Sequence, residues 1–337
     1  MSQILTMINP AFQKISIEGG TRLAIAEMKL TLSKFVDNFE VKTREICGIN
    51  YLQADFDGEI SEIAIEKLSR MASMFAMFEL KGEGLYPLEK KKYSNLNQGL
   101  SSMLKYAGKT NEYFTKLLVH IAMLESNCKV MNAMHILDPV AGKGTTLFES
   151  VIGGCDAYGL EIGEKVVQET TVFFKKFLEN DRIKHNYVFN RDGHRNETHT
   201  FEFADLNCEL KTNPRKLVMG MGNCQFVDKI YKKDFFHAIV GDLPYGIMHG
   251  NVTNEKQGSL TRNPKELLTA CLPAWREVLK SGGSLVLSWN SFTLPTVELR
   301  KTVESFGFEV LNGDLYDNFS HRVDQAIMRD VCVARKL

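Results

Sequence analysis

The chain has 337 residues, of which 44% are hydrophobic, so it is long enough for two domains with substantial cores. Its formal net charge is zero, so the charge of the whole molecule neither favours nor excludes a nucleic-acid partner. Seven scattered cysteines without a Cys-x-x-Cys pair argue against a disulfide framework and a zinc ribbon. No apolar run approaches the ~20 residues of a membrane span, and the N-terminus lacks the layout of a secretion signal. We therefore expect a soluble, cytoplasmic protein without a membrane partner, either a monomer or a homodimer.

The first 82 residues contain four strand patterns and two helix patterns. Apolar residues at strand spacing predict strands at 13–18, 39–46, 49–55 and 75–80. Residues at helical spacing predict one helix over 21–35 and a second from about Ser61. Because β-α-β-β-α-β is the ferredoxin-like order, we expect a small α+β domain over residues 1–82.

Residues 83–110 are predicted to form a linker, since they are rich in Gly, Asn, Ser, Lys and Tyr. The charge changes sign here. Residues 1–85 carry 9 basic and 12 acidic side chains, a net of −3, whereas residues 86–130 carry 7 and 3, a net of +4. Lys90–Lys92 is the centre of the basic stretch. A run this short is more often a solvated linker, but it is also a candidate for contacts to phosphates.

From residue 111 to residue 337, strands and helices alternate. After a helix at 111–125, strands are predicted at 134–139, 156–160, 216–221, 236–241, 283–289, 307–312 and about 325–334. Helices are predicted at 144–153, 163–179, 264–280 and 295–306. This alternation predicts an α/β fold, a mainly parallel sheet with helices on both faces.

The segment 180–215 fits no helical pattern, and its Asn190–Gly193 turn signal predicts a protruding hairpin. It contains His185, His194 and His199. No cysteine or carboxylate pattern completes a tetrahedral set with them, so we expect exposed polar histidines and no metal site.

A glycine turn follows the strand at 134–139 and opens into a helix. Its sequence is Asp138-Pro139-Val140-Ala141-Gly142-Lys143-Gly144-Thr145. Glycines permit a tight turn and a close approach of a ligand to the backbone. The phosphate-binding P-loop pattern fails because Gly144 follows Lys143, and the dinucleotide pattern fails because Leu147 takes the place of its third glycine.

This turn resembles the first motif of class I S-adenosylmethionine-dependent methyltransferases. The resemblance implies a Rossmann-like sheet with an antiparallel last hairpin, and S-adenosyl-L-methionine as the cofactor. It assigns cofactor binding to residues of the turn and of the next strand ends: Asp138, Pro139, Ala141, Gly142, Gly144, Thr145, Glu161, Asn223 and Asp242. Glu161 would accept hydrogen bonds from both ribose hydroxyls, since a carboxylate offers two acceptors. Asn223 would accept a hydrogen bond from the adenine amino group, and Asp205 is the alternative residue for that role.

The strand at 236–241 ends in Asp242-Leu243-Pro244-Tyr245. Taken alone, this stretch is equally well explained by an ordinary turn that contains a proline. It also resembles the Asp/Asn-Pro-Pro-Tyr motif of amino-methyltransferases, with Leu243 in place of the first proline. The resemblance implies that these four residues are catalytic. A carboxylate and a backbone carbonyl would accept the hydrogens of an exocyclic amine and direct its lone pair, while Tyr245 would stack on an unstacked base.

The Asp-x-Pro-Tyr-Gly motif after a ferredoxin-like segment, together with the stretch 319–330, resembles the family of tRNA guanine-N2 methyltransferases that act on position 10. The chain would be a bacterial relative that lacks a full THUMP module, because only about 30 residues separate Leu80 from the helix at 111–125. RNA, with tRNA first, is the expected partner. The alternatives are an rRNA guanine-N2 methyltransferase, a DNA adenine-N6 or cytosine-N4 methyltransferase, and a non-catalytic binding module. RNA is favoured over DNA because no separate target-recognition domain is visible.

Overall fold

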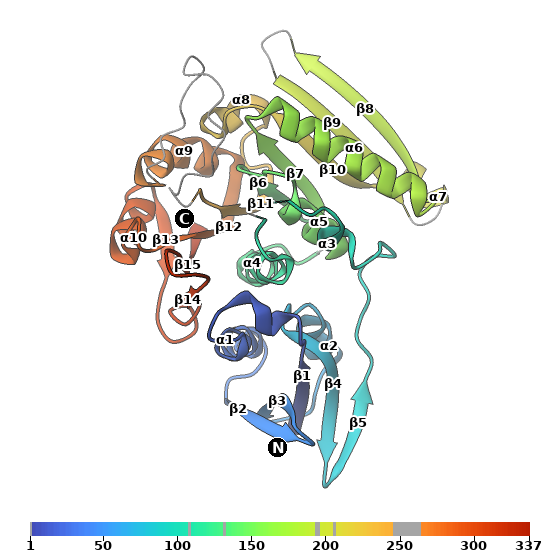
Figure 1. Cartoon of the computed structure of the whole chain (residues 1–337), viewed down its shortest axis with the longest axis vertical. Helices are drawn as coiled ribbons and strands as arrows, with labels where there is room; N and C mark the ends of the chain where they lie inside the picture. Colours follow the sequence, from blue (N-terminus) through green and yellow to red (C-terminus); the bar gives the residue numbers. More distant parts are fainter. Residues whose placement is uncertain (1, 107–108, 131–132, 193–195, 205–206, 245–263) are drawn as a thin grey trace.

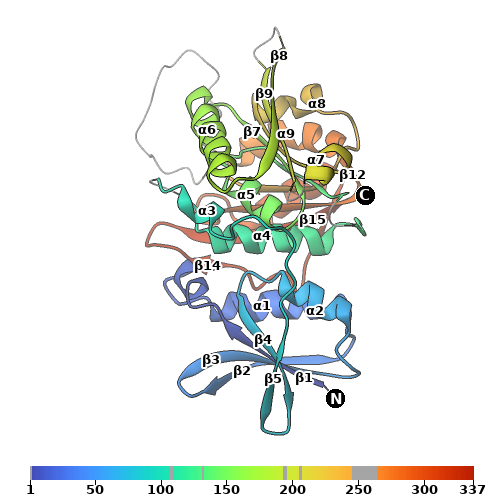
Figure 2. The same ribbon diagram turned by 90° about the vertical axis from the view of Figure 1, so that its right-hand side faces the viewer.

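The computed structural model describes residues 2–106, 109–130, 133–192, 196–204, 207–244 and 264–337. Two sheets organise these residues, and helices separate them (Figure 1). Figure 2 shows the layers: the small sheet, then α1 and α2, then α4, then the large sheet.

The small sheet is antiparallel and has the strand order β2-β3-β1-β4-β5. Its elements are β1 Ser2–Ile8, α1 Thr21–Leu32, β2 Phe39–Ile46, β3 Ile49–Phe56, α2 Glu62–Ser69, β4 Met74–Lys81 and β5 Gly84–Leu88. The first four strands and two helices follow the predicted β-α-β-β-α-β order, so the ferredoxin-like expectation is confirmed. The sheet extends beyond residue 82. Its last strand, β5, lies within the segment that was expected to be a linker.

The predicted first strand at 13–18 is wrong. Residues Phe12–Ile15 form a 3₁₀ helix, and the strand lies earlier, at Ser2–Ile8. Phe12 and Ile15 are both buried and lie three residues apart, which is the spacing of one helical face. The alternation over 13–18 imitates a strand, whereas β1 is the strand that pairs on both sides, with β3 and β4.

The large sheet has ten strands, in the order β13-β15-β12-β11-β6-β7-β10-β9-β8, with β14 paired to β15. Its strands are β6 His135–Asp138, β7 Asp156–Glu161, β8 Lys184–Asp192, β9 Asn196–Ala204, β10 Arg215–Met221, β11 Phe236–Asp242, β12 Leu279–Asn290, β13 Phe308–Leu311, β14 His321–Arg322 and β15 Met328–Lys336. Its helices are α3 Leu100–Met103, α4 Glu112–Glu125, α5 Thr145–Ile152, α6 Glu164–Asn180, α7 Asn207–Thr212, α8 Val227–Ile230, α9 Pro264–Val278 and α10 Thr296–Ser305, with a 3₁₀ turn at Cys224–Phe226. Five central strands run parallel, and β15 lies antiparallel between β12 and β13. The expected Rossmann-like sheet, mainly parallel with an antiparallel last hairpin, is therefore present.

The hairpin expected at 180–215 forms from β8 and β9, and it is part of the large sheet. Its second strand, β9, pairs antiparallel with β10 from Arg215 to Met221 and extends the large sheet. Phe201 and Phe203 explain this placement, because both are buried and contact Phe174 of α6 edge-on. The expectation of exposed histidines is wrong for His199, which is buried and hydrogen-bonded through Nδ1 to the Tyr187 hydroxyl at 2.8 Å.

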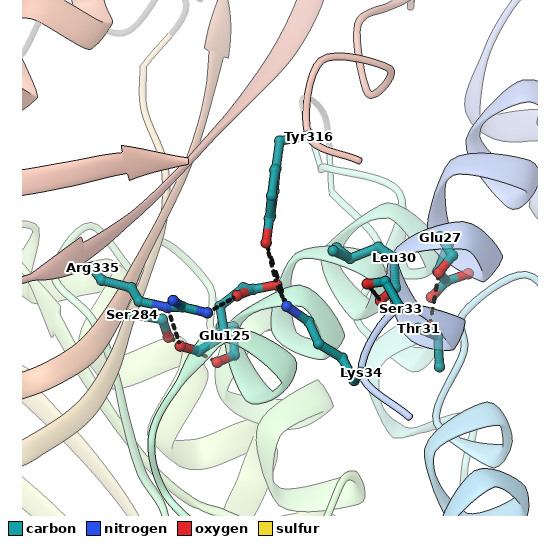
Figure 3. Close-up of polar contacts among 10 residues, drawn as sticks. Glu27, Leu30, Thr31, Ser33, Lys34, Glu125, Ser284, Tyr316 and Arg335 are labelled. Carbon is teal, nitrogen blue, oxygen red and sulfur yellow. Dashed lines mark hydrogen bonds and ion pairs between the residues drawn. The ribbon is translucent and has the colours of Figure 1, made fainter. Parts of the chain in front are cut away.

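The small-sheet helices pack against α4 through a continuous apolar core, and buried polar contacts cross the same junction. Glu27 of α1 accepts from His120 Nδ1 of α4 at 2.9 Å, and both side chains are buried. Figure 3 shows a second junction around Glu125, the last residue of α4. Its fully buried carboxylate binds Lys34 and Arg335, each at 2.5 Å, and the Tyr316 hydroxyl at 3.0 Å. These contacts join α1 and the C-terminal strand to one helix. The division into 1–82, 83–110 and 111–337 stays a prediction.

Among the described residues there is neither a membrane-spanning helix nor a metal-binding cluster. No helix there is both long and apolar enough to cross a bilayer. No group of three or more His, Cys, Asp or Glu side chains there is arranged to hold a metal ion. Six cysteines are free thiols: Cys47, Cys128, Cys155, Cys224, Cys271 and Cys332.

Candidate active site

Three neighbouring strands of the large sheet end on carboxylates. The strands β11, β6 and β7 are adjacent and parallel, and they end at Asp242, Asp138 and Glu161. Because parallel strands present their carboxyl ends at one edge of a sheet, the three residues meet there. Ligands of open α/β sheets bind at this edge.

The glycine turn between β6 and α5 has two glycines with positive φ angles. Gly142 has φ +50°, and a Cβ added there would meet no atom within 4 Å. Gly144 has φ +81° and immediately precedes α5, and a Cβ there would lie 3.0 Å from Thr170 Cγ2. Ala141 N donates to Leu160 O at 3.0 Å and ties the turn to β7. Space for a ligand therefore lies over Gly142, and close packing lies behind Gly144.

Glu161 closes one side of this turn. Its Oε2 accepts from Gly142 N at 3.1 Å, and its Oε1 accepts from Gly163 N at 2.8 Å. The side chain is half-buried, and each carboxylate oxygen keeps a further lone pair. The carboxylate is thus fixed against the turn and can still accept two hydrogen bonds.

Asp138 lies beneath the turn and is 3% exposed. Burial raises the pKa of its carboxyl to about 7, although the Thr146 hydroxyl and Val140 N both donate to it. The negative charges of Asp242 and Glu161 raise this pKa further. Since like charges penalise the ionised form, the site as it stands favours a positively charged ligand. Pro139, Ala141 and Thr145 are buried around it.

Asp242 is oriented by two hydroxyls. Thr110 Oγ1 donates to its Oδ2 at 2.5 Å, and Ser288 Oγ donates to its Oδ1 at 2.8 Å. Leu243 N donates to Ser288 O at 2.8 Å, so the pairing of β11 with β12 continues past the aspartate. The Leu243 side chain is 1% exposed in the core, and Pro244 is exposed. Tyr245 lies outside the described residues.

Asn223 lies directly after β10. Gly222 N donates to Glu161 O at 2.9 Å, which ties the end of β10 to the end of β7. The Asn223 carbonyl oxygen accepts from Gln225 N at 2.9 Å and keeps one lone pair. Its rival, Asp205, lies outside the described residues, as does His194. The ligand-binding and catalytic roles of all these residues stay predictions.

No protein-family model matches this sequence, and no curated protein matches it either. Among solved structures, TrmN from Thermus thermophilus is similar over 100% of both chains, with 11% sequence identity and a TM-score of 0.45. TehB from Haemophilus influenzae covers 83% of this chain and 84% of its own, with 13% identity and a TM-score of 0.40. A magnesium protoporphyrin IX methyltransferase from Synechocystis PCC 6803, with bound SAM, covers 67% and 79%, with 13% identity and a TM-score of 0.41. The likeness is one of fold. It carries no argument about what this chain binds.

Three residues at the site belong to no motif in the sequence: Thr110, Ser288 and Tyr106. Thr110 gave no signal because it belongs to no motif. Ser288 could have been found only as the residue of the neighbouring strand β12 that pairs with Asp242. Tyr106 approaches Thr145 Oγ1 at 3.4 Å through its hydroxyl, and Lys143 Nζ lies 5.0 Å from its ring centroid. Burial raises the pKa of the Tyr106 phenol, so it stays a neutral hydroxyl beside the turn.

Proposed function

We propose that this chain is an S-adenosylmethionine-dependent N-methyltransferase that acts on an exocyclic amine of a nucleic-acid base, with guanine N2 in tRNA as the leading substrate. The observation that carries the proposal is the meeting of Asp138, Glu161 and Asp242 on three adjacent strand ends around the open Gly142 turn.

The residues present fit the cofactor. S-adenosylmethionine has a positive sulfonium, a positive ammonium and a ribose diol, and it supplies an electrophilic methyl group when bound. The open space over Gly142 admits the methionine part, and the free lone pairs of Glu161 suit the diol. The buried Asp138, whose pKa is raised to about 7, gains from a neighbouring cation.

Asp242 performs the step that the substrate amine needs. An amine conjugated to a ring is a poor nucleophile, because its lone pair is delocalised. A fixed carboxylate that accepts one of its hydrogens directs the lone pair towards the methyl group and can receive the proton that nitrogen releases. Thr110 and Ser288 hold the two oxygens of Asp242 in place before the substrate arrives. The stacking role of Tyr245 and the role of the Leu243 carbonyl belong to the same proposal.

The nucleic-acid part of the proposal rests on the Asp-x-Pro-Tyr motif and the ferredoxin-like domain beside the large sheet. The test is incubation with labelled S-adenosylmethionine and, separately, total tRNA, rRNA and DNA. We expect label in tRNA. Label in rRNA alone would identify rRNA as the substrate in place of tRNA, and label in DNA alone would overturn the RNA assignment. Absence of label together with absence of cofactor binding by calorimetry would favour a non-catalytic module. A cytoplasmic location and a monomeric or homodimeric state remain predictions.

A further inference from the structure

The junction between the two sheets contains a hollow that the candidate active site does not use. It has a volume of about 300 Å³ and lies where α2, α4 and α5 meet the chain that joins β5 to α3. Figure 2 shows that connecting chain passing across the junction of α2 and α4. The cations that line the hollow come from three segments: Arg70, Lys90, Lys91, Lys92 and Lys116. Glu149 is its acidic residue, and burial raises the pKa of that carboxyl to about 7.

A second hollow, of about 450 Å³, adjoins the first across Arg70 and Tyr93, which line both. The Arg70 guanidinium stacks over the Tyr93 ring at 3.5 Å and donates to Gly153 O at 2.6 Å. The second hollow adds the cations Lys67, Lys129 and Arg215 and one acid, Glu66. Together the two hollows therefore bring eight cationic side chains and two acidic ones to one place, in a chain whose net charge is zero.

Few of these charges are neutralised within the protein. Among the described residues, carboxylates lie within 4 Å of Lys91 and Arg70, paired with Glu62 and Glu66, but not of Lys67, Lys92, Lys116 or Lys129. Desolvation lowers the pKa of the Lys90 ammonium to about 8, and the positive charge of Lys116 lowers it further. Such an arrangement is costly unless an anion joins it.

Buried nitrogen atoms without a partner mark the same place. Arg70, which is 7% exposed, has an Nε that donates to no acceptor, and Nη1 of Arg215 also lacks one. Buried donors are almost always satisfied, so unsatisfied guanidinium donors in a cationic hollow indicate a missing acceptor. Guanidinium and ammonium groups together are suited to phosphate oxygens.

We propose that the two hollows form one anion site, which takes successive phosphates of a nucleic-acid backbone and so anchors the substrate. This inference rests on the proposed function for the identity of the ligand. Two cationic hollows that share Arg70 suit a chain of phosphates better than they suit one small phosphate ester. The site shares helices with the candidate active site, because α4 begins just after Thr110 and α5 begins just after Gly144. A backbone anchored here would therefore be held by the same two helices that border Asp242 and the glycine turn.

The test uses the full chain without cofactor and measures binding to labelled tRNA by fluorescence anisotropy at several salt concentrations. Lys92→Gln, Lys116→Gln and Lys129→Gln each remove one charge from the lining and leave the ion pairs of Arg70 and Lys91 in place. Lys176→Gln, on the exposed face of α6, is the matched control. Each lining variant should weaken binding about threefold to tenfold and reduce the slope of log affinity against log salt by roughly 0.7 to 0.9. The control should change affinity less than about twofold.

A parallel titration with inorganic pyrophosphate, at constant ionic strength, separates a backbone site from a small-ester site. Competition of pyrophosphate with tRNA that weakens in Lys116→Gln supports the proposal. Binding of pyrophosphate without binding of tRNA overturns it, as does tRNA binding that all three variants leave unchanged. Because binding is measured without turnover, a failure of methyl transfer alone would contradict the proposed function and leave this site standing. Unchanged melting temperatures of the variants exclude misfolding as the cause of any loss.

Discussion

Replacing Asp242 by alanine should abolish most of the methyl transfer while sparing cofactor binding. The carboxylate is oriented by hydrogen bonds from Thr110 at 2.5 Å and Ser288 at 2.8 Å, so its removal deletes a preorganised acceptor. Loss of one such group costs roughly 2.7 to 4 kcal/mol in the transition state, or about 10²- to 10³-fold in rate. Cofactor affinity should fall less than about tenfold, because Asp138 and Glu161 still supply negative charge.

Three further variants sharpen this prediction. Asp242→Asn keeps one acceptor oxygen and should retain more activity than Asp242→Ala. Ser288→Ala and Thr110→Val leave the carboxylate present but less well oriented, and each should slow transfer about tenfold.

Single-turnover transfer from labelled S-adenosylmethionine measures the rate, and calorimetry measures the affinity. If Asp242→Ala transfers methyl groups within about threefold of the wild-type rate, the role assigned here is refuted. A loss of transfer that merely follows a loss of cofactor binding would also contradict it.

The remaining predictions concern the cofactor and the junction between the sheets. Glu161→Ala should weaken S-adenosylmethionine binding about 10- to 100-fold in calorimetry, since charge-assisted hydrogen bonds contribute about 1.5 to 3 kcal/mol. Affinity should rise with pH through about 7, because Asp138 then ionises beside Glu161 and Asp242 and attracts the cationic ligand. The raised pKa means that the folded protein binds this proton more tightly than the unfolded chain does, so ionisation of Asp138 lowers the stability of the fold as the pH rises towards about 7. Asp138→Asn should remove the pH dependence of cofactor binding. Glu125→Gln should lower the free energy of unfolding by roughly 3 kcal/mol in chemical denaturation, since it leaves Lys34 and Arg335 without their buried carboxylate. An unchanged denaturation midpoint would show that this junction contributes little.

The strands of the large sheet could be predicted because their residues form short apolar runs that end at glycines and carboxylates. The turn at 138–145 and Glu161 followed from the same pattern, since chain order fixes which strand ends adjoin. The first strand could not be found, because the alternation at 13–18 imitates a strand while burial of Phe12 and Ile15 favours a 3₁₀ turn.

Other features depend on contacts between distant segments, which no local pattern records. Thr110 and Ser288 reach Asp242 across 132 and 46 residues of sequence. Likewise, Glu27 and His120 meet across 93 residues, and Arg70 and Arg215 approach Tyr93 from different segments. The charge of Lys90–Lys92 was visible in the sequence. Its position over a hollow with Lys116 depends on how the two sheets pack.

We propose that Asp242, at the end of β11, promotes the methylation of an exocyclic amine in RNA. Mass spectrometry of nucleosides, from total tRNA treated with S-adenosylmethionine and either wild-type protein or Asp242→Ala, tests it most directly. We expect newly formed N2-methylguanosine with the wild-type protein and little or none with the variant. Equal amounts of a methylated nucleoside with both proteins, or no methylated nucleoside in any RNA, would contradict it.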